Sequence, residues 1–560
     1  MPSSVSLSGS SPTEISFGEK MRKQFFALLL LSAMLVPTAA FGQVSVKITK
    51  AERQLAEGVT ASQLKDYLYF ISSDAMGGRD TPSQGLDVTA EFIKMNLSRW
   101  GFKPAGDDGT FFQKMNIIRD TIDPVNTYID INGKKFTLGQ GFYPMPGTSG
   151  DIASAPVVFA KGGWVIKSKN INDFEGIDVK GKVVALQATG APGRQGVIAL
   201  PEGVTQQDLS GKRGEDWSDG VTYATANGAV GVVILPSSFL TENWGMLGGQ
   251  LGRGSASVEK LNDGAAGRGR GSRLPGFFLS EDAAKELAAT SAGDLNKTIT
   301  AKISTRQERT PTQNVVAVWE GAGPLKHEYV AIGAHYDHDG IRPNAPGEDK
   351  IWNGADDDGS GTVAMLAIAE AFSKSKVRPK RSILFVWHAG EEKGLWGSAY
   401  FNKFPTVDIK NVVTQINIDM IGRSKKPGDT NPKNAELSGP NEVYVIGSNM
   451  MSTTLDEVTK ATNDAYLRME YNPKYNDPKD PNRFFFRSDH FNYAVNGIPV
   501  VFWFTGVHED YHQASDTADK IDYAKMEKIT RTIMLTLWEV SELKQRPAVD
   551  KQLPPELTQR

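Results

Sequence analysis

From Asn314 onward, short and strongly apolar runs alternate with stretches of helical periodicity. The runs are NVVAVWEG, EYVAIGAH, SILFVWHAG, VVTQINIDMIG, EVYVIG and IPVVFWFTG, and helices are expected over 362–372, 454–465 and 523–543. Apolar runs without polar alternation are typical of strands that are buried on both faces. This part of the chain therefore predicts an α/β fold, with a mixed, largely parallel sheet sandwiched by helices.

Two further regions have different residue patterns. Near the start, Thr60 is a suitable cap for a helix with Leu64, Leu68 and Ile71 on one face, and a second amphipathic run covers 88–100. Between residues 139 and 300, short β-branched runs separated by glycine and proline predict an inserted, mainly β domain. We therefore expect one domain from 43–138 and 301–545, an insert at 139–300 and a tail at 546–560.

The first residues have the pattern of an export signal. Arg22 and Lys23 precede an apolar stretch that ends at Val36, and small residues lead to Gln43. Twelve apolar-region residues are too few for a spanning helix, which needs about 20. We expect translation from Met21, removal of residues 1–42, and a periplasmic or extracellular protein with no membrane segment in its mature form.

Composition excludes several classes of partner and site. The formal net charge is -3 and there is no polybasic tract, so neither nucleic acid nor an anionic membrane surface is an expected partner. Cysteine is absent, which rules out disulfides and zinc–thiolate sites. The composition leaves the oligomeric state open.

Residues of the types that bind zinc lie at or just after the expected strands and in polar loops. Because the functional crevice of an open α/β sheet lies beyond the carboxyl ends of its strands, we expect these residues to converge. Histidine and carboxylate ligands around paired metals outline a two-metal hydrolytic site. The residues are His335 in AHYDH, Asp357 in NGADDDGSG, Glu392 in HAGEEKG, Asp419 in INIDMIG and His512 in DYHQASDT.

Each motif also has a structural explanation. The partial positive charge at a helix amino terminus can compensate the negative charge of one aspartate in the run 356–358, but hardly that of all three. Paired glutamates such as Glu391 and Glu392 are common helix caps, yet one can bind metal while the other acts as general base. A salt bridge would also satisfy Asp419 in its apolar run. Asp337 is placed to orient the imidazole of His335, and His338 is expected to be a neighbour rather than a ligand.

The remaining histidines, His327, His388, His490 and His508, are expected to be structural. The turn-rich stretch NPKYNDPKDPNRFFFRSDH includes the RSDH segment, 487–490. Phe484, Phe485 and Phe486, with Arg487, are candidates to line a substrate pocket. The three phenylalanines are also compatible with a place in the core.

In this order, the motifs resemble the secreted di-zinc aminopeptidases of the family that includes glutamate carboxypeptidase and the transferrin receptor. SSDAMGGRDTPSQGLDVTAEFI is similar to that family's amino-terminal region, and GKVVALQATG with ANGAVGVVIL resembles a protease-associated domain. The resemblance implies a zinc exopeptidase fold and two zinc ions per chain. It places His335 and Asp419 on one zinc and Glu392 and His512 on the other. It also implies that Asp357 bridges the two, in preference to Asp356 or Asp358, that Glu391 is the general base, that Asp337 supports His335, and that Tyr511 stabilises the oxyanion.

The expected function is therefore hydrolysis of amino-terminal residues from peptides by an exported zinc aminopeptidase. Three alternatives remain. A carboxypeptidase of the glutamate-carboxypeptidase kind would use Arg483 or Arg487 to hold the substrate carboxylate. A glutaminyl-cyclase-like acyltransferase would share much of the ligand set. A non-catalytic receptor on the same fold would be expected to lack ligands that are present here.

Overall fold

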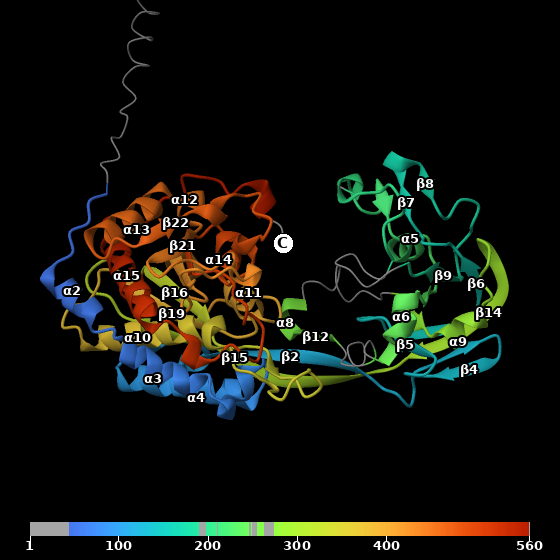
Figure 1. Cartoon of the computed structure of the whole chain (residues 1–560), viewed down its shortest axis with the longest axis horizontal. Coiled ribbons are helices and arrows are strands. Elements are labelled where there is room, and N and C mark those ends of the chain that lie inside the picture. The colour runs from blue at the N-terminus through green and yellow to red at the C-terminus, as the bar shows by residue number, and fades with distance from the viewer. Residues whose placement is uncertain are drawn as a thin grey trace, which may run out of the picture. The chain divides into compact units, whose positions relative to one another are not determined.

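The computed structural model of the chain describes residues 44–189, 198–209, 211–245, 248, 255–262 and 274–558. Its largest sheet confirms the predicted mixed α/β class and runs in the order β12-β2-β15-β19-β16-β20-β23-β21-β22, with β1 paired to β15 (Figure 1). The neighbours β19, β16, β20 and β23 are parallel, whereas β15 and β21 join them antiparallel. The strands of this sheet are β1 (Lys103–Pro104), β2 (Phe112–Ile122), β12 (Ser255–Val258), β15 (Thr305–Trp319), β16 (Tyr329–His335), β19 (Ser382–His388), β20 (Val412–Ile418), β21 (Glu442–Ile446), β22 (Glu470–Asn472) and β23 (Val500–Phe504).

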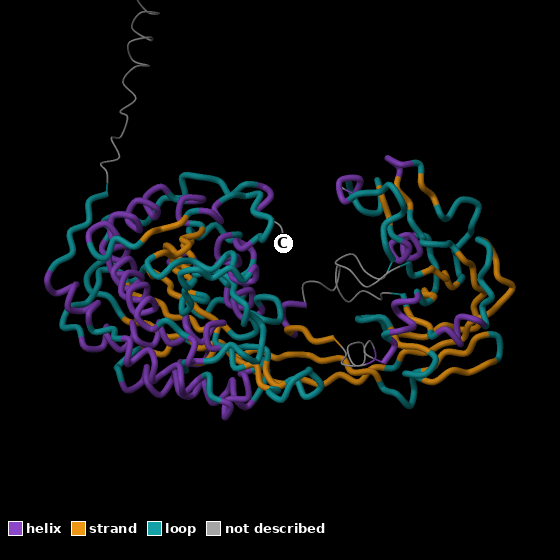
Figure 2. Tube along the Cα trace, in the orientation of Figure 1, coloured by secondary structure: helices purple, strands orange, loops and turns teal. Residues whose placement is uncertain are grey.

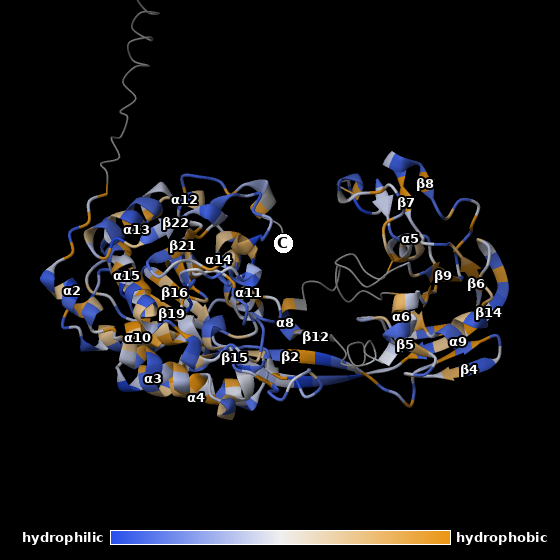
Figure 3. Cartoon of the chain, in the orientation of Figure 1, coloured by the Kyte–Doolittle hydropathy of each residue, from blue (hydrophilic) through white to orange (hydrophobic). Residues whose placement is uncertain are grey.

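The central strands are buried on both faces, as their uninterrupted apolar sequences predict. On one face, Phe385 of β19 contacts Phe372 of α10, which stacks on Trp538 of α15, with ring centroids 6.4 and 6.1 Å apart. On the other face, Leu384 belongs to the same buried cluster as Tyr493 of α14. Figure 3 colours the strands around β16 and β19 as largely hydrophobic. The helices of this part are α10 (Gly361–Lys374), α11 (Trp396–Lys403), α12 (Ser448–Met451), α13 (Thr453–Ala465), α14 (His490–Ala494) and α15 (Tyr523–Glu542).

The predicted amino-terminal helices are present. Before them lies α2 (Lys50–Glu57), and they are α3 (Ala61–Ile71) and α4 (Gln84–Arg99). Thr60 caps α3 as predicted, in a reciprocal capping box with Gln63. The turn-rich sequence between α3 and α4 forms a short 3-10 segment, Asp74–Arg79, which ends with the guanidinium of Arg79 completely buried.

A second sheet, separate from the first, runs in the order β4-β3-β14-β6-β9-β11-β13-β5 (Figure 2). Its strands are β3 (Tyr128–Ile131), β4 (Lys134–Thr137), β5 (Phe142–Pro144), β6 (Gly150–Phe159), β9 (Val183–Gln187), β11 (Gly231–Leu235), β13 (Gly276–Leu279) and β14 (Gly293–Ile303). Two buried apolar clusters cover its faces. Small helices accompany it, α5 (Gly220–Ala226), α6 (Ser238–Glu242) and α9 (Glu281–Lys285).

Two expected boundaries differ from the structure. The second sheet begins before residue 139, because β3 pairs with β14 and β4 pairs with β3. The predicted tail, 546–560, is not detached over its described part: Thr453 N–H donates to Asp550, and Leu557 is buried in the core cluster beside the main sheet. The predicted signal segment, 1–42, lies outside the described residues. Among the residues that are described, no helix has the length and apolar character needed to cross a membrane.

Candidate functional site

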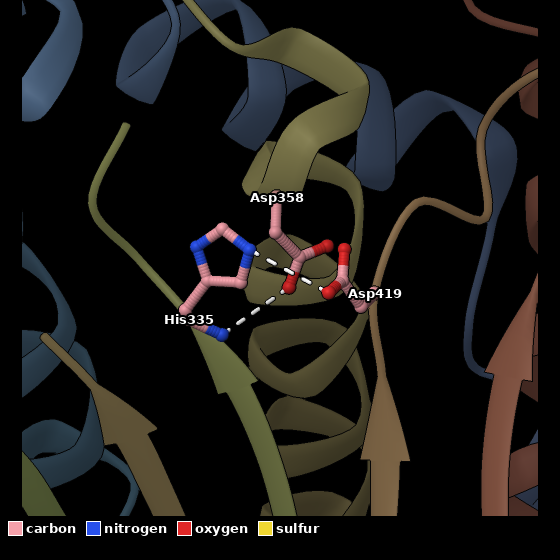
Figure 4. A group of neighbouring side chains, drawn as sticks. All are labelled: His335, Asp358 and Asp419. Atoms are coloured by element: carbon pink, nitrogen blue, oxygen red, sulfur yellow. Dashed lines mark hydrogen bonds and ion pairs between the residues drawn. The ribbon is translucent and has the colours of Figure 1, made fainter. Parts of the chain in front are cut away.

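The carboxyl ends of β16, β19, β20 and β23 lie along one edge of the main sheet, since these neighbouring strands are parallel. His335 is the last residue of β16, and Asp419 directly follows β20 (Figure 4). The Nε2 atom of His335 lies 3.7 Å from Oδ2 of Asp419, and both side chains are buried. The predicted convergence of strand ends is therefore present.

The aspartate run is the loop that enters α10, and its three carboxylates have different partners. Asp356 accepts the N–H of Gly422 and lies 3.2 Å from Nε2 of His508. The carboxylate of Asp358 accepts backbone N–H groups of His335, Gly361 and Met420, so it ties β16, α10 and the end of β20 together.

Asp357 alone among the three places its carboxylate between two histidines. Its Oδ1 atom lies 3.3 Å from Nε2 of His335, and its Oδ2 atom lies 3.1 Å from Nε2 of His512. The carboxylate of Asp516 accepts the N–H groups of Asp356 and Asp357 and thereby holds the loop in place. A carboxylate in this position can bridge two cations.

The adjacent glutamates after β19 face different parts of the cluster. Oε2 of Glu391 lies 3.9 Å from Nε2 of His335, whereas Oε2 of Glu392 lies 3.2 Å from Nε2 of His512. His338 is fully buried beside Glu392, with its Nδ1 atom 2.7 Å from Oε1 of Glu392. His338 was expected to neighbour the ligands, but its short contact with Glu392 was not expected from the sequence.

Asp337 supports the loop between β16 and the cluster. The backbone carbonyl of Asp337 lies 3.2 Å from Nδ1 of His335, its Oδ1 atom lies 3.6 Å from the same nitrogen, and Oδ1 accepts the N–H of Glu391. Arg79, which sequence reasoning missed, reaches the same loop by donating to the carbonyl of Tyr336. It also donates to the carbonyls of Ile71, Asn353 and Gly354. The only sequence signal for this role was an arginine within the turn-rich stretch before α4.

The cluster concentrates negative charge in a buried place. Burial, and then the neighbouring carboxylates, raise the pKa values of Glu391 and Glu392 well above their usual range. Burial also acts against the charged form of Asp357, but the imidazoles of His335 and His512 outweigh it and hold its pKa well below the usual range. Protonation or bound cations can relieve the repulsion among carboxylates packed in this way.

A pocket opens beside the cluster. Asp357, Glu391, Asp419 and His512 form its polar part. Its other lining residues are Met420, Phe484, Arg487, Phe502, Phe504, Val507 and Tyr511. Arg487 donates to the hydroxyl of Tyr511 at 3.0 Å and its guanidinium lies over the ring of Phe484, 4.9 Å from the centroid.

Only part of the FFFR segment lines this pocket. Phe484 and Arg487 do, whereas Phe485 and Phe486 pack against Phe491 in the core, the other place that the sequence allowed for them. Their aromatic character reflects the interior they fill. Apolar residues distant in sequence, such as Phe502 and Val507, line the pocket instead, and the sequence held no signal for them.

Of the histidines predicted to be structural, three are buried. His388 contacts Asp489 at 3.3 Å, His490 stacks on Phe502, and His508 contacts Asp356. His327 is exposed and contacts the carbonyl of Pro324.

Comparison with known proteins gives a family match for the part of the chain that contains the clustered histidines and carboxylates. Residues 314–537 match the model of peptidase family M28. A probable leucine aminopeptidase 2 of Aspergillus oryzae is 30% identical over 245 residues, which are 43% of this chain and 42% of that protein. A probable leucine aminopeptidase of Arthroderma benhamiae is 30% identical over 220 residues, 38% of this chain and 54% of that protein. The matched segment thus spans about half the length of these relatives.

Among solved structures, an aminopeptidase from Aneurinibacillus sp. strain AM-1 aligns over 90% of this chain and 98% of its own, with 17% identity and a TM-score of 0.49. All the clustered histidines and carboxylates, from His335 to His512, fall within the segment that the family model matches. The site therefore lies in the part of this chain, residues 314–537, that is similar to peptidase family M28.

Proposed function

We propose that this chain is an exported zinc aminopeptidase that removes amino-terminal residues from peptides by a two-metal mechanism. The observation that carries the proposal is the position of Asp357, with one carboxylate oxygen 3.3 Å from His335 and the other 3.1 Å from His512. His335 and Asp419 would hold one zinc ion, Glu392 and His512 the other, and Asp357 both. Several relatives carry the name leucine aminopeptidase, which supports the same activity.

The donor atoms fit zinc in type, and two of them lack other partners. They are imidazole nitrogens and carboxylate oxygens, the ligands of catalytic zinc sites. Nε2 of His335 and Oε1 of Glu392 are buried and have no hydrogen-bond partner among the residues that the structure describes. An unpaired buried polar atom is costly, and a cation would compensate it.

When bound, the zinc ions would polarise the scissile carbonyl and lower the pKa of the attacking water. Glu391 would take the proton from that water and deliver it to the leaving amine. Its carboxylate lies 3.9 Å from Nε2 of His335, close to the proposed ligands. Burial, which raises its pKa well above the usual range, suits a group that must both accept and return a proton.

Tyr511 would donate its hydroxyl proton to the oxyanion that forms on the carbonyl oxygen. Burial raises the pKa of Tyr511 well above its usual value, so the hydroxyl stays protonated. Arg487 donates to the oxygen of that hydroxyl, which leaves the proton of Tyr511 available for another acceptor. Asp337 would hold His335 in position through its Nδ1 side.

The apolar part of the pocket favours an apolar side chain at the cleaved residue. Met420, Phe502, Phe504 and Val507 offer no charged partner to a polar side chain. Burial of a leucine-sized side chain there contributes about 1.5–3 kcal/mol. We expect leucine, methionine and phenylalanine to be preferred over glutamate and lysine.

Two further parts of the proposal concern the rest of the chain. The amino-terminal charge and apolar pattern supports export, with the mature protein starting near Gln43 in the periplasm or outside the cell. The second sheet would be an inserted, protease-associated-like domain. Amino-terminal sequencing of this protein from an exported fraction would test whether the mature chain starts near Gln43.

A carboxypeptidase is the second candidate, and one observation favours it. Arg487 lies in the pocket lining, where its guanidinium could pair with a substrate carboxylate. Arg483, the other candidate for this role, lies over the ring of Phe486 instead, 4.3 Å from the centroid.

Mass spectrometry of peptides digested by the purified protein separates these functions. The same peptides would be supplied with free and with acetylated amino termini. Loss of single residues from the free set alone supports an aminopeptidase. Trimming of the acetylated set would establish a carboxypeptidase, and loss of ammonia without a released amino acid would establish a cyclase.

A further inference from the structure

His338 is placed as a metal ligand rather than as a neighbour of the ligands. It follows β16 by three residues and its side chain has no exposed surface. Its backbone N–H donates to the carbonyl of Arg79. Its ring is pressed against Gly354, where an added Cβ would come within 2.4 Å of Cγ of His338. The imidazole is therefore held in one place by its backbone and by its packing.

The Nδ1 atom of His338 points into the cluster. It lies 2.7 Å from Oε1 of Glu392 and 3.9 Å from Oδ2 of Asp357. Despite the short distance, neither Nδ1 of His338 nor Oε1 of Glu392 forms a hydrogen bond with any described residue. These two atoms are close together but are not aligned for a hydrogen bond with each other. Such an arrangement suits two ligands that face a common cation.

His512 contacts the same two carboxylate residues. Its ring is nearly perpendicular to that of His338, with an interplanar angle of 87° and centroids 5.7 Å apart. Nε2 of His512 lies 3.1 Å from Oδ2 of Asp357 and 3.2 Å from Oε2 of Glu392. His338 and His512 thus approach Glu392 from different elements, His338 at Oε1 and His512 at Oε2.

We propose that His338 is a direct ligand of the second zinc ion, together with His512, Glu392 and Asp357. This inference rests on the proposed zinc function. It makes the two metal positions unequal, because the first has only His335, Asp419 and Asp357. Structural zinc sites are closed by four protein ligands, whereas catalytic sites keep an open position beside three. The second zinc ion would therefore bind more tightly, and the first would offer the open position.

Zinc X-ray absorption on the purified, zinc-loaded wild-type protein tests the ligand count directly. Three histidines for two zinc ions predict about 1.5 imidazoles per zinc, whereas His335 and His512 alone predict about 1.0. A value near 1.0 would overturn the assignment of His338 and leave the zinc function intact. A protein that binds no zinc would overturn the proposed function itself.

Chelator titration of variants gives a second, independent readout. His338→Ala should weaken the tighter zinc by more than about 100-fold, beyond the 10–100-fold typical of residues that only orient a ligand. The weaker zinc should be little changed. His338→Asn tests whether an amide that forms hydrogen bonds can replace the imidazole. It should not restore the zinc affinity that is lost at the tighter site in His338→Ala. His490→Asn changes another fully buried histidine and should leave both affinities unchanged. If His338→Asn restores wild-type affinity, His338 only orients Glu392 and the proposal is wrong.

Discussion

Asp357 and Asp358 are consecutive residues whose carboxylates face different surroundings. The carboxylate of Asp357 lies between the imidazoles of His335 and His512, whereas that of Asp358 accepts the backbone N–H of His335. The three donors to Asp358 are all backbone groups, so this side chain serves the architecture of the strand ends. This arrangement favours Asp357 as the bridging residue over both of its neighbours in the run.

Replacement of Glu391 by glutamine should separate zinc binding from catalysis. The amide cannot accept the proton of the attacking water, so kcat should fall by about 10²–10⁴-fold. Zinc content, measured by elemental analysis, should stay at the wild-type level because Glu391 is not assigned as a ligand. Turnover near the wild-type value in Glu391→Gln would contradict its role as general base.

Zinc binding to the metal-free protein should release protons. Burial acts against the charged imidazole of His512, but Asp357 and Glu392 outweigh it and raise the pKa of His512 to about 9. At pH 8 this imidazole is mostly protonated in the metal-free protein, and it must lose its proton to bind zinc. Below that pH, affinity should fall further.

Calorimetric titrations at pH 8 in buffers of different ionisation enthalpy measure this release. We expect at least about one proton per chain. Binding enthalpies that are the same in every buffer would show that His512 is already neutral.

Arg79→Lys should destabilise the protein although the charge is kept. Burial lowers the pKa of Arg79 to about 10, so the guanidinium remains charged at neutral pH. It donates to carbonyls on both loops that carry the cluster, and a lysine ammonium cannot reproduce this planar set of donors. We expect a loss of about 2–4 kcal/mol in the free energy of unfolding.

Urea denaturation of metal-free protein would measure the loss, with Arg99→Lys, an exposed position on α4, as the control. A change below about 0.5 kcal/mol in Arg79→Lys, as is usual for surface positions, would show that the loops do not depend on this guanidinium.

Glu539 on α15 should make the stability of the protein depend on pH. Burial, followed by repulsion from Glu52 and Glu542, raises its pKa from 4.5 to about 7. Between these values the folded protein binds more protons than the unfolded chain, so stability falls as pH rises from about 4.5 to 7. Because the side chain is partly exposed, we expect an effect of only about 1 kcal/mol.

Thermal unfolding across this range, compared between wild type and Glu539→Gln, isolates the contribution. The variant should gain stability relative to wild type as pH rises. Glu57→Gln, at an exposed position on α2, serves as the control. If stability changes with pH in the same way in wild type and Glu539→Gln, the raised pKa of Glu539 is contradicted.

The sequence predicted the features that depend on local pattern and on parallel strands. Apolar runs placed His335 and Asp419 at strand ends, and the parallel order then required these ends to meet. Thr60 and Gln63 form the expected cap because capping depends only on neighbouring residues.

Features that depend on packing between distant segments could not be predicted from local sequence patterns. Phe485 and Phe486 have the composition of a pocket lining but fill the core. His338 was expected only to neighbour the ligands, and its short contact with Glu392, which follows the neighbouring strand β19, could not be predicted. Arg79 lies more than two hundred residues before the carbonyls of Tyr336 and Gly354 that it binds, and no local pattern connects them.

The most direct test of the account is the anomalous scattering of zinc in crystals of the zinc-loaded protein. We predict two peaks about 3.5–4 Å apart, both bound by Asp357. His335 and Asp419 should contact one zinc ion, and Glu392, His512 and His338 the other. A single peak, or a carboxylate other than that of Asp357 between two peaks, would contradict the account.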